Sequence, residues 1–254
     1  MSGGGARLDP LARRGFARGA AAYARARPGY PEEALDWAVE QAGVRPGDLV
    51  IDVGAGTGRL TQLLLERGLR VVAVEPLAEM REHLEAALPE ADVRGGTAEA
   101  LPGLDGHAAA VFAANAFHWF DAERAPGEIH RVLRPGGALV LVWGLRDTSD
   151  PLQAQLEALA DRLFRDTDGY PIPSSRAVLD GSGLFTAAGR RTFPYRQELD
   201  EGGVVDLVSS WSIVGAAAPA ARTAVLEEVA GLVRGRGRVS LLYRTDVRVH
   251  RAAP

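Results

Sequence analysis

Two residue types are missing from this chain. None of its 254 residues is a cysteine, and all 29 of its arginine and lysine positions are arginine. Without cysteine there are no disulfides, thiol nucleophiles or thiolate metal sites, and without lysine there is neither Schiff-base chemistry nor a P-loop lysine. The five histidines are scattered without metal-ligand spacing, so we expect no bound metal. Catalysis must then come from a histidine, a tyrosine, a carboxylate or a bound cofactor.

Long apolar runs and a strong net charge are also absent. Apolar runs such as Ala138–Trp143 have the length of a strand and not of a membrane-spanning helix. The formal net charge of −4 gives no overall attraction to a phosphate backbone. We therefore expect a cytoplasmic protein with no membrane and no nucleic-acid partner. The sequence does not indicate the oligomeric state.

Short apolar runs alternate with amphipathic segments from residue 48 to residue 144. The runs predict strands at Val50–Val53, Val71–Val74, Ala91–Arg94, Ala109–Ala114 and Ala138–Trp143. The intervening segments predict helices at Arg59–Arg67, Ala78–Leu88 and Ala122–Leu133. This alternation is typical of βαβ units in an α/β fold with a parallel sheet covered on both faces.

The rhythm changes after residue 144. Helices are predicted at Pro151–Arg165, Glu201–Ser212 and Pro219–Arg234, and strands at Arg191–Leu199 and Val239–His250. A further helix is predicted at Glu32–Ala42, after the extended turn of Arg27 to Pro31. We expect the last two strands to complete the same sheet.

The most informative stretch is a strand that runs into a glycine-rich turn. Gly54, Gly56 and Gly58 follow Val50–Val53 and precede a helix. Glycines allow positive φ and let the backbone approach a ligand, which the free amides at the helix start can face. The dinucleotide fingerprint needs its third glycine at the position that Arg59 occupies, so NAD fits this turn poorly.

With Asp52 before it and Glu75 ending the next strand, this G-x-G-x-G turn resembles that of the class I S-adenosylmethionine-dependent methyltransferases. The run AFHWFD at residues 116–121 resembles the signature of a type 11-like small-molecule subgroup that includes trans-aconitate methyltransferase-like proteins. The resemblance implies a doubly wound, mostly parallel seven-stranded Rossmann-like sheet with an N-terminal lid helix and helical insertions. It also implies S-adenosylmethionine as cofactor and S-adenosylhomocysteine as its product.

The same resemblance implies roles for individual residues. Glu75 would accept hydrogen bonds from the ribose hydroxyls, and Met80 would lie against the adenine. Thr97 stands where the family usually has an aspartate for the adenine amino group, although the backbone of Ala98 could still contact the ring. The full implied cofactor-binding set is Asp52, Gly54, Ala55, Gly56, Gly58, Glu75, Pro76, Met80, Thr97, Ala98, Glu99, Asn115, Phe117 and Tyr30.

His118 and Tyr23 are the candidate catalytic residues. His118 lies just past the carboxyl end of a predicted strand, where its near-neutral pKa would suit removal of a proton from a hydroxyl or amine. Candidate acceptor contacts are Trp119, Trp143, Arg146, Trp211 and Tyr243. Arg146 and Arg244 are candidates to hold a carboxylate acceptor. A purely structural role is the alternative for each of these residues.

We expect residues 1–254 to form a single methyltransferase-like domain. Residues 1–30 would form an N-terminal lid segment, 31–144 the cofactor-binding core, and 145–254 the substrate-covering elements with the last strands. Residues 8–27 have apolar residues at helical spacing, which predicts an amphipathic helix packed on the domain; an arginine-rich transit peptide is the alternative.

The leading functional hypothesis is methyl transfer to an O-, C- or N-nucleophile of a small organic acceptor by in-line displacement. Nucleic-acid amino-methyltransferases of this class have a proline-containing turn after the fourth strand, whereas the run here, Asn115 to His118, has no proline. Two alternatives stay open. The fold could catalyse a cyclisation, isomerisation or decarboxylation with the cofactor bound structurally, or it could be a cofactor-binding module without catalysis.

Overall fold

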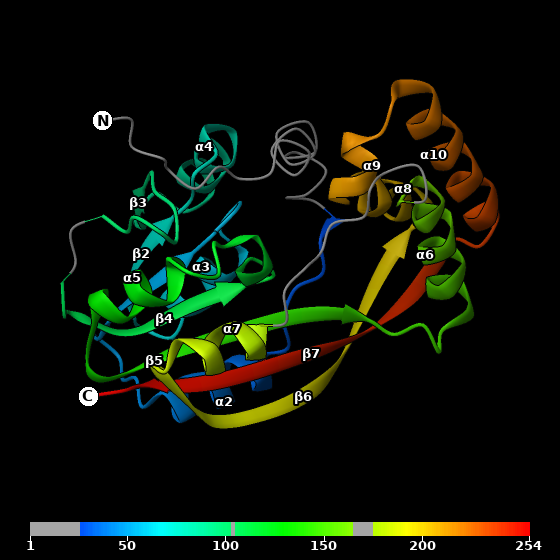
Figure 1. Cartoon of the computed structure of the whole chain (residues 1–254). Helices are drawn as coiled ribbons and strands as arrows, with labels where there is room; N and C mark the ends of the chain where they lie inside the picture. Colours follow the sequence, from blue (N-terminus) through cyan, green and yellow to red (C-terminus); the bar gives the residue numbers. More distant parts are fainter. Residues whose placement is uncertain (1–25, 103–104, 165–174) are drawn as a thin grey trace.

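A seven-stranded sheet organises the computed structural model, which describes residues 26–102, 105–164 and 175–254 (Figure 1). Its strands are β1 (Leu49–Val53), β2 (Arg70–Val74), β3 (Asp92–Arg94), β4 (Ala108–Ala114), β5 (Leu133–Arg146), β6 (Phe185–Asp200) and β7 (Arg238–Ala252). Their order is β3-β2-β1-β4-β5-β7-β6, with β1 to β5 parallel and β7 antiparallel to both β5 and β6. The predicted α/β class and mostly parallel seven-stranded sheet are confirmed.

Helices cover both faces of this sheet. They are α2 (Glu32–Ala42), α3 (Arg59–Leu65), α4 (Ala78–Ala87), the 3-10 turn η1 (Phe117–Trp119), α5 (Ala125–Val132), α6 (Pro151–Phe164), α7 (Ser175–Ser182), α8 (Glu201–Ser209), α9 (Ser212–Ala216) and α10 (Pro219–Val233). Leu35 of α2 and Leu64 of α3 pack on one face of the sheet, in the same cluster as Val50. Ile129 of α5 and Leu179 of α7 pack on the other, where Ile51 points.

Neighbouring residues of β1 belong to opposite faces of the sheet, because successive side chains of a strand point to alternate sides. The buried clusters on the two faces consist almost wholly of aliphatic side chains, together with Phe112 and Phe193 on one face and Phe117 and Phe185 on the other. Strands buried on both faces read as continuous apolar runs, which is why the sequence pattern predicted them.

The helices α6, α8, α9 and α10 form a separate layer at one end of the long strands (Figure 1). Leu156 of α6, Leu207 of α8 and Val229 of α10 are fully or almost fully buried against one another and against Leu241 and Tyr243 of β7. This helical group covers the extension of β5, β6 and β7 past the parallel part of the sheet. It therefore faces the carboxyl ends of the parallel strands.

Some predicted bounds differ from the structure. β6 begins at Phe185, six residues before the predicted start at Arg191, and β5 begins at Leu133 and not at Ala138. The extra residues at the start of these two strands are mostly exposed, so no apolar run in the sequence predicted them. Their pairing with neighbouring strands defines them as strand residues. The helix α7 was not predicted, and the predicted helix Glu201–Ser212 is divided into α8 and α9.

No helix in the three described ranges is both long and apolar enough to cross a membrane.

Candidate functional site

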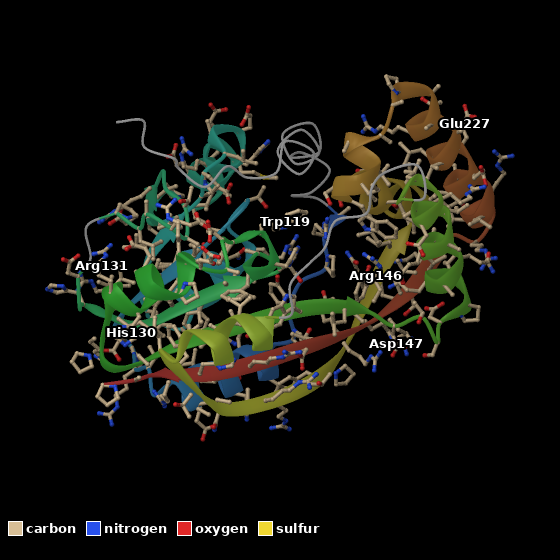
Figure 2. All side chains as sticks on the ribbon, viewed as in Figure 1. Trp119, His130, Arg131, Arg146, Asp147 and Glu227 are labelled. Atoms are coloured by element: carbon tan, nitrogen blue, oxygen red, sulfur yellow. The ribbon has the colours of Figure 1, made fainter. Side chains whose placement is uncertain are left out.

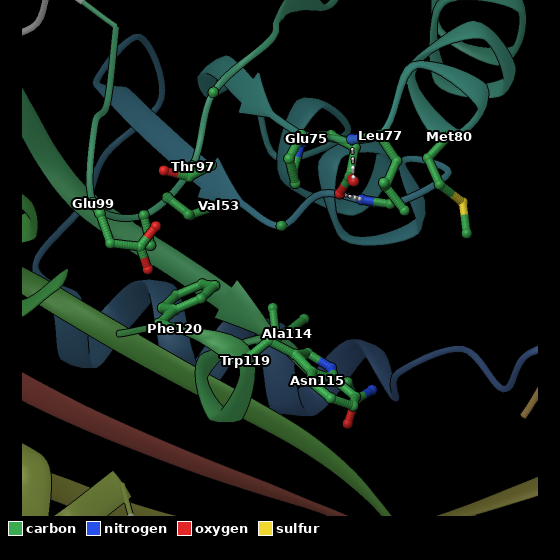
Figure 3. A pocket seen from close by; sticks show the side chains of 16 residues that line it. Val53, Glu75, Leu77, Met80, Thr97, Glu99, Ala114, Asn115, Trp119 and Phe120 are labelled. Carbon is green, nitrogen blue, oxygen red and sulfur yellow. Dashed lines mark hydrogen bonds between the residues drawn. The ribbon is translucent and has the colours of Figure 1, made fainter. Parts of the chain in front are cut away.

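A first cavity opens at the carboxyl ends of β1, β2 and β4 (Figure 3). The strand order reverses between β1 and β4, and open parallel sheets bind ligands at such a point. The cavity holds about 770 Å³ of space, open solvent at its mouth included. Its lining is Val53, Gly54, Gly56, Glu75, Pro76, Leu77, Met80, Gly96, Thr97, Ala98, Glu99, Ala114, Asn115, Ala116, Trp119 and Phe120.

The glycine turn between β1 and α3 forms one edge of this cavity. Gly54, Gly56 and Gly58 all have positive φ, at 71°, 59° and 89°. A Cβ on Gly54 would lie 2.7 Å from the Cβ of Ala116, so this position excludes every side chain. The turn is held to β2 because the amide of Gly54 donates to the carbonyl of Val74 at 2.8 Å.

Glu75 lies directly after β2 and is 5% exposed. Its Oε2 accepts a hydrogen bond from the amide of Gly56 at 3.0 Å, and its Oε1 accepts one from the amide of Leu77 at 3.0 Å (Figure 3). Burial raises the pKa of Glu75, while these two amides and Arg81 act in the opposite direction. The carboxylate is thus oriented by backbone amides and still lines the cavity.

Asp52 lies behind this edge and does not line the cavity. It is fully buried in β1, and its Oδ2 accepts a hydrogen bond from the hydroxyl of Thr61 at 2.7 Å. Its Oδ1 has no hydrogen-bond partner in the part of the chain that the structure describes. Burial raises the pKa of Asp52 to about 7, and the nearby charge of Glu75 adds to the rise.

The wall beyond Glu75 combines apolar and polar groups. Met80 of α4 is 2% exposed and lies on the same side of the cavity as Glu75 and Leu77 (Figure 3). Thr97 and Glu99 follow β3, and Glu99 accepts a hydrogen bond from the amide of Asp121 at 2.8 Å. This bond ties the segment after β3 to the segment after η1.

Asn115 lines both this first cavity and a second one. Its φ of 50° is the only positive value at a non-glycine residue in the described ranges. Its Nδ2 donates to the hydroxyl of Tyr30 at 2.9 Å, and its Oδ1 accepts from the amide of Gly144 at 3.0 Å. The side chain is therefore fixed at both ends where the two cavities adjoin.

The second cavity lies between the sheet and the helical group of α6, α8, α9 and α10. It holds about 460 Å³, open solvent included. Arg146, at the end of β5, points into this region (Figure 2). Its guanidinium lies 4.4 Å from the ring centroid of Trp211 and donates to Glu157 at 2.9 Å. The lining is Arg27, Pro28, Tyr30, Arg59, Asn115, Gly144, Arg146, Leu207, Trp211 and Tyr243.

His118 lines neither of these cavities. It lies in η1 and borders a small hollow with Phe117, Phe120 and Val178. Burial lowers the pKa of His118 to about 4, and the positive charge of Arg27 contributes to the lowering. The ring is therefore neutral at pH 7 and has a weak affinity for a proton.

The other predicted residues divide between the cavities and the core. Trp119 lines the first cavity, whereas Trp211 and Tyr243 line the second. Trp143 lines neither; the guanidinium of Arg248 lies 5.0 Å from its ring centroid.

Four more predicted residues lie outside both linings. Arg244 pairs with Asp147 at 3.5 Å, and its side chain is 56% exposed. Ala55, Gly58 and Phe117 are packing positions close to the first cavity, and Tyr23 lies outside the described residues.

Several lining residues were not predicted. Leu77, Gly96 and Phe120 line the first cavity, and Arg27 and Arg59 line the second. A sequence signal existed for Arg59, because it directly follows the glycine turn. No signal in the sequence indicated that Leu207 lines the second cavity, since its pattern is that of an ordinary core position of α8.

The described residues contain no group of three or more histidines and acids that could hold a metal ion.

Comparison with known proteins identifies the family. A family model described as a methyltransferase domain matches residues 51–141. An uncharacterized methyltransferase of Mycobacterium tuberculosis strain H37Rv is 41% identical over 218 residues, which cover 86% of this chain and 85% of the relative. The chain belongs to the methyltransferase family. An uncharacterized methyltransferase-like protein of Schizosaccharomyces pombe is 31% identical over 200 residues, which cover 78% of each.

Solved structures show the same fold for this methyltransferase. A putative type II methyltransferase from Anaeromyxobacter dehalogenans has a TM-score of 0.62 and 25% identity, covering 89% of this chain and 97% of that one. Geranyl diphosphate methyltransferase in complex with SAM has a TM-score of 0.51 and 17% identity, covering 87% and 85%. The predictions of a class I methyltransferase fold and of a methyltransferase enzyme are confirmed.

Proposed function

We propose that this methyltransferase transfers a methyl group from S-adenosylmethionine to an oxygen, carbon or nitrogen nucleophile of a small organic acceptor in the cytoplasm. The first cavity carries the proposal. It combines, at the point where the strand order of a parallel sheet reverses, two glycines of the turn after β1 and a buried carboxylate that backbone amides orient. The glycines let a ligand approach the backbone closely, and the carboxylate can accept hydrogen bonds from the hydroxyls of a ribose.

The residues of this cavity fit the donor. Each carboxylate oxygen of Glu75 accepts one backbone amide, and because such an oxygen can accept two hydrogen bonds, each keeps capacity for a ribose hydroxyl. Leu77, Met80 and Ala98 offer apolar surface for the adenine, and Thr97 offers a hydroxyl beside it. The absence of side chains at Gly54 and Gly56 leaves the floor of the cavity open to the rest of the donor.

When bound, S-adenosylmethionine supplies a methyl group that its positive sulfonium already activates. The task of the protein is then to hold the acceptor nucleophile in line with that methyl group and to exclude water. Orientation of this kind can supply roughly 7–11 kcal/mol of the barrier reduction. We propose that Asn115 forms the boundary between the two cavities. Its side chain is held in place by hydrogen bonds with Tyr30 and Gly144.

His118 is our candidate base for an acceptor that must lose a proton, such as a hydroxyl. Its neutral ring is in the correct protonation state at pH 7, but a pKa of about 4 makes it a weak base. His118 itself lines neither cavity, although Phe120 borders both its hollow and the first cavity. We therefore propose that orientation contributes more to this reaction than proton removal does.

Incubation with methyl-labelled S-adenosylmethionine and a panel of acids, phenols and amines tests the proposal. We expect S-adenosylhomocysteine in equal amount to a product that carries one added methyl group. Product without consumption of the donor would instead support the non-methylating alternative. Donor binding with no product from any acceptor or cell extract would support the non-catalytic alternative.

A variant of His118 tests in this assay whether the residue acts in turnover or in donor binding. His118→Ala should lower turnover on a hydroxyl acceptor at least about tenfold and leave donor affinity near that of the wild type. Unchanged turnover on that acceptor would remove His118 from the mechanism.

A further inference from the structure

Three arginines from distant parts of the chain meet at the second cavity. Arg27 precedes α2, Arg59 is the first residue of α3, and Arg146 ends β5. No carboxylate belongs to the described lining of this cavity. Arginine side chains gathered around one hollow create a positive potential there, and low-dielectric walls strengthen it.

Neighbouring groups hold two of these guanidinium groups in place. Arg27 donates to the carbonyl of Ser210 at 3.0 Å and to its hydroxyl at 3.2 Å, and both acceptors are neutral. Arg146 is held between Glu157 and the ring of Trp211, so Glu157 offsets part of its charge. A guanidinium has five N–H donors, and Arg146 uses its Nε and one terminal nitrogen toward Glu157, so it keeps further donors.

Tyr243 supplies an independent observation. Its side chain lines the same cavity, the residue is only 4% exposed, and its hydroxyl makes no hydrogen bond of ordinary geometry among the described residues, although the Gln153 side chain interacts with it. Burial raises the pKa of Tyr243, and the interaction with Gln153 and the charges of Arg146 and Arg27 partly offset this rise, so the hydroxyl is protonated at pH 7. A buried hydroxyl without a partner costs free energy, which a ligand that accepts its hydrogen bond would recover.

We propose that the second cavity is a binding site for an anionic group, a carboxylate or a phosphate, of the acceptor molecule. Arg27, Arg59 and Arg146 would neutralise its charge, and the hydroxyl of Tyr243 would donate a hydrogen bond to it. Such charge-assisted bonds are about twice as strong as neutral ones. Because Asn115 lines both cavities, an acceptor held here adjoins the first cavity. Only the identification of the anion as part of an acceptor rests on the proposed function.

Calorimetric titration of the full chain at low ionic strength tests this site. The probes are succinate, inorganic phosphate and the neutral analogue succinamide. We expect succinate or phosphate to bind at least about tenfold more tightly than succinamide, since only the anions can form charge-assisted hydrogen bonds. Tighter binding of succinate assigns the site to carboxylates, and tighter binding of phosphate assigns it to phosphates. Equal affinity for all three probes would overturn the proposal.

Variants locate the binding within the molecule. Arg59→Gln should weaken binding of the preferred anion at least about tenfold, and Tyr243→Phe, which removes one oxygen, about fivefold. The matched control is Arg196→Gln, an exposed arginine of β6 outside the cavity, which should bind as the wild type does. Circular dichroism verifies that each variant is folded. Wild-type affinity in a folded Arg59→Gln and in Tyr243→Phe would place the anion elsewhere and overturn the proposal.

A titration with S-adenosylhomocysteine on the same samples separates this inference from the proposed function. Binding of S-adenosylhomocysteine without binding of either anion overturns the anion site and leaves the proposed function intact. Anion binding that Arg59→Gln weakens, without binding of S-adenosylhomocysteine, supports the anion site and contradicts the proposed function.

Discussion

The carboxylate of Glu75 accepts a hydrogen bond from the backbone amide of Gly56 at 3.0 Å. Together with the bond from the amide of Gly54 to the carbonyl of Val74, it connects the end of β2 to the glycine turn after β1, so both edges of the first cavity are positioned together. Removing the carboxylate would leave the Gly56 amide without this acceptor and would remove the candidate ribose contact. The bond therefore has consequences for ligand affinity as well as for the local structure.

Glu75→Ala should weaken binding of S-adenosylhomocysteine at least about tenfold, because hydrogen bonds to a charged group each contribute about 1.5–3 kcal/mol. Isothermal titration calorimetry measures the affinity. Glu79→Ala is the matched control, since Glu79 is an exposed acid on α4 outside the cavity lining. Equal affinity of Glu75→Ala and the wild type would exclude the ribose assignment.

Gly54→Ala should destabilise the protein by at least about 2 kcal/mol, because a left-handed backbone disfavours a side chain and the new methyl group would overlap Ala116. Urea unfolding measures the change. Gly106→Ala separates the two causes: its φ of 65° is similar, but a Cβ there meets nothing within 4 Å. A loss of stability as small in Gly54→Ala as in Gly106→Ala would show that the overlap is relieved without cost.

Asp52 should make the stability of the protein depend on pH. Its pKa is about 7 in the folded state against 3.8 for the ordinary group, so the folded state binds its proton more tightly. The stabilising contribution of this group is complete below pH 3.8 and is lost as the pH rises through 7. The free energy of unfolding of Asp52→Asn should therefore increase relative to that of the wild type as the pH rises from 4 to 8. A constant difference over that range would contradict the raised pKa.

His118 should titrate far below the usual range of histidine. Its pKa of about 4 against the ordinary 6.5 means that the unfolded chain takes up a proton at a higher pH than the folded protein does. Stability should consequently fall as the pH decreases from 6.5 towards 4. Resonances of the His118 ring, assigned with His118→Gln, measure the midpoint by NMR. A midpoint near 6.5 would show that water solvates the ring.

The sheet could be predicted from the sequence because its central strands are buried on both faces. Ala109–Ala114 is a continuous apolar run, Val50–Val53 is interrupted only by Asp52, and the glycine turn marks where the strand at Val50–Val53 meets a helix. The start of β6 had no such signal, because its first residues are mostly exposed and only their pairing with β7 makes them a strand. The first cavity was predictable in the same way, since the carboxyl ends of neighbouring parallel strands must meet at one edge.

The sequence by itself determined the class of fold, the family and the glycine turn with Glu75, because each depends on residues close together in the chain or on a regular period. Only the tertiary structure decided which side chains share the second cavity. Arg27, Arg59 and Tyr243 are brought together by the return of β7 alongside β5 and by the packing of the helical group. It also decided that the ring of His118 is buried and lines neither cavity, since burial depends on contacts among distant segments.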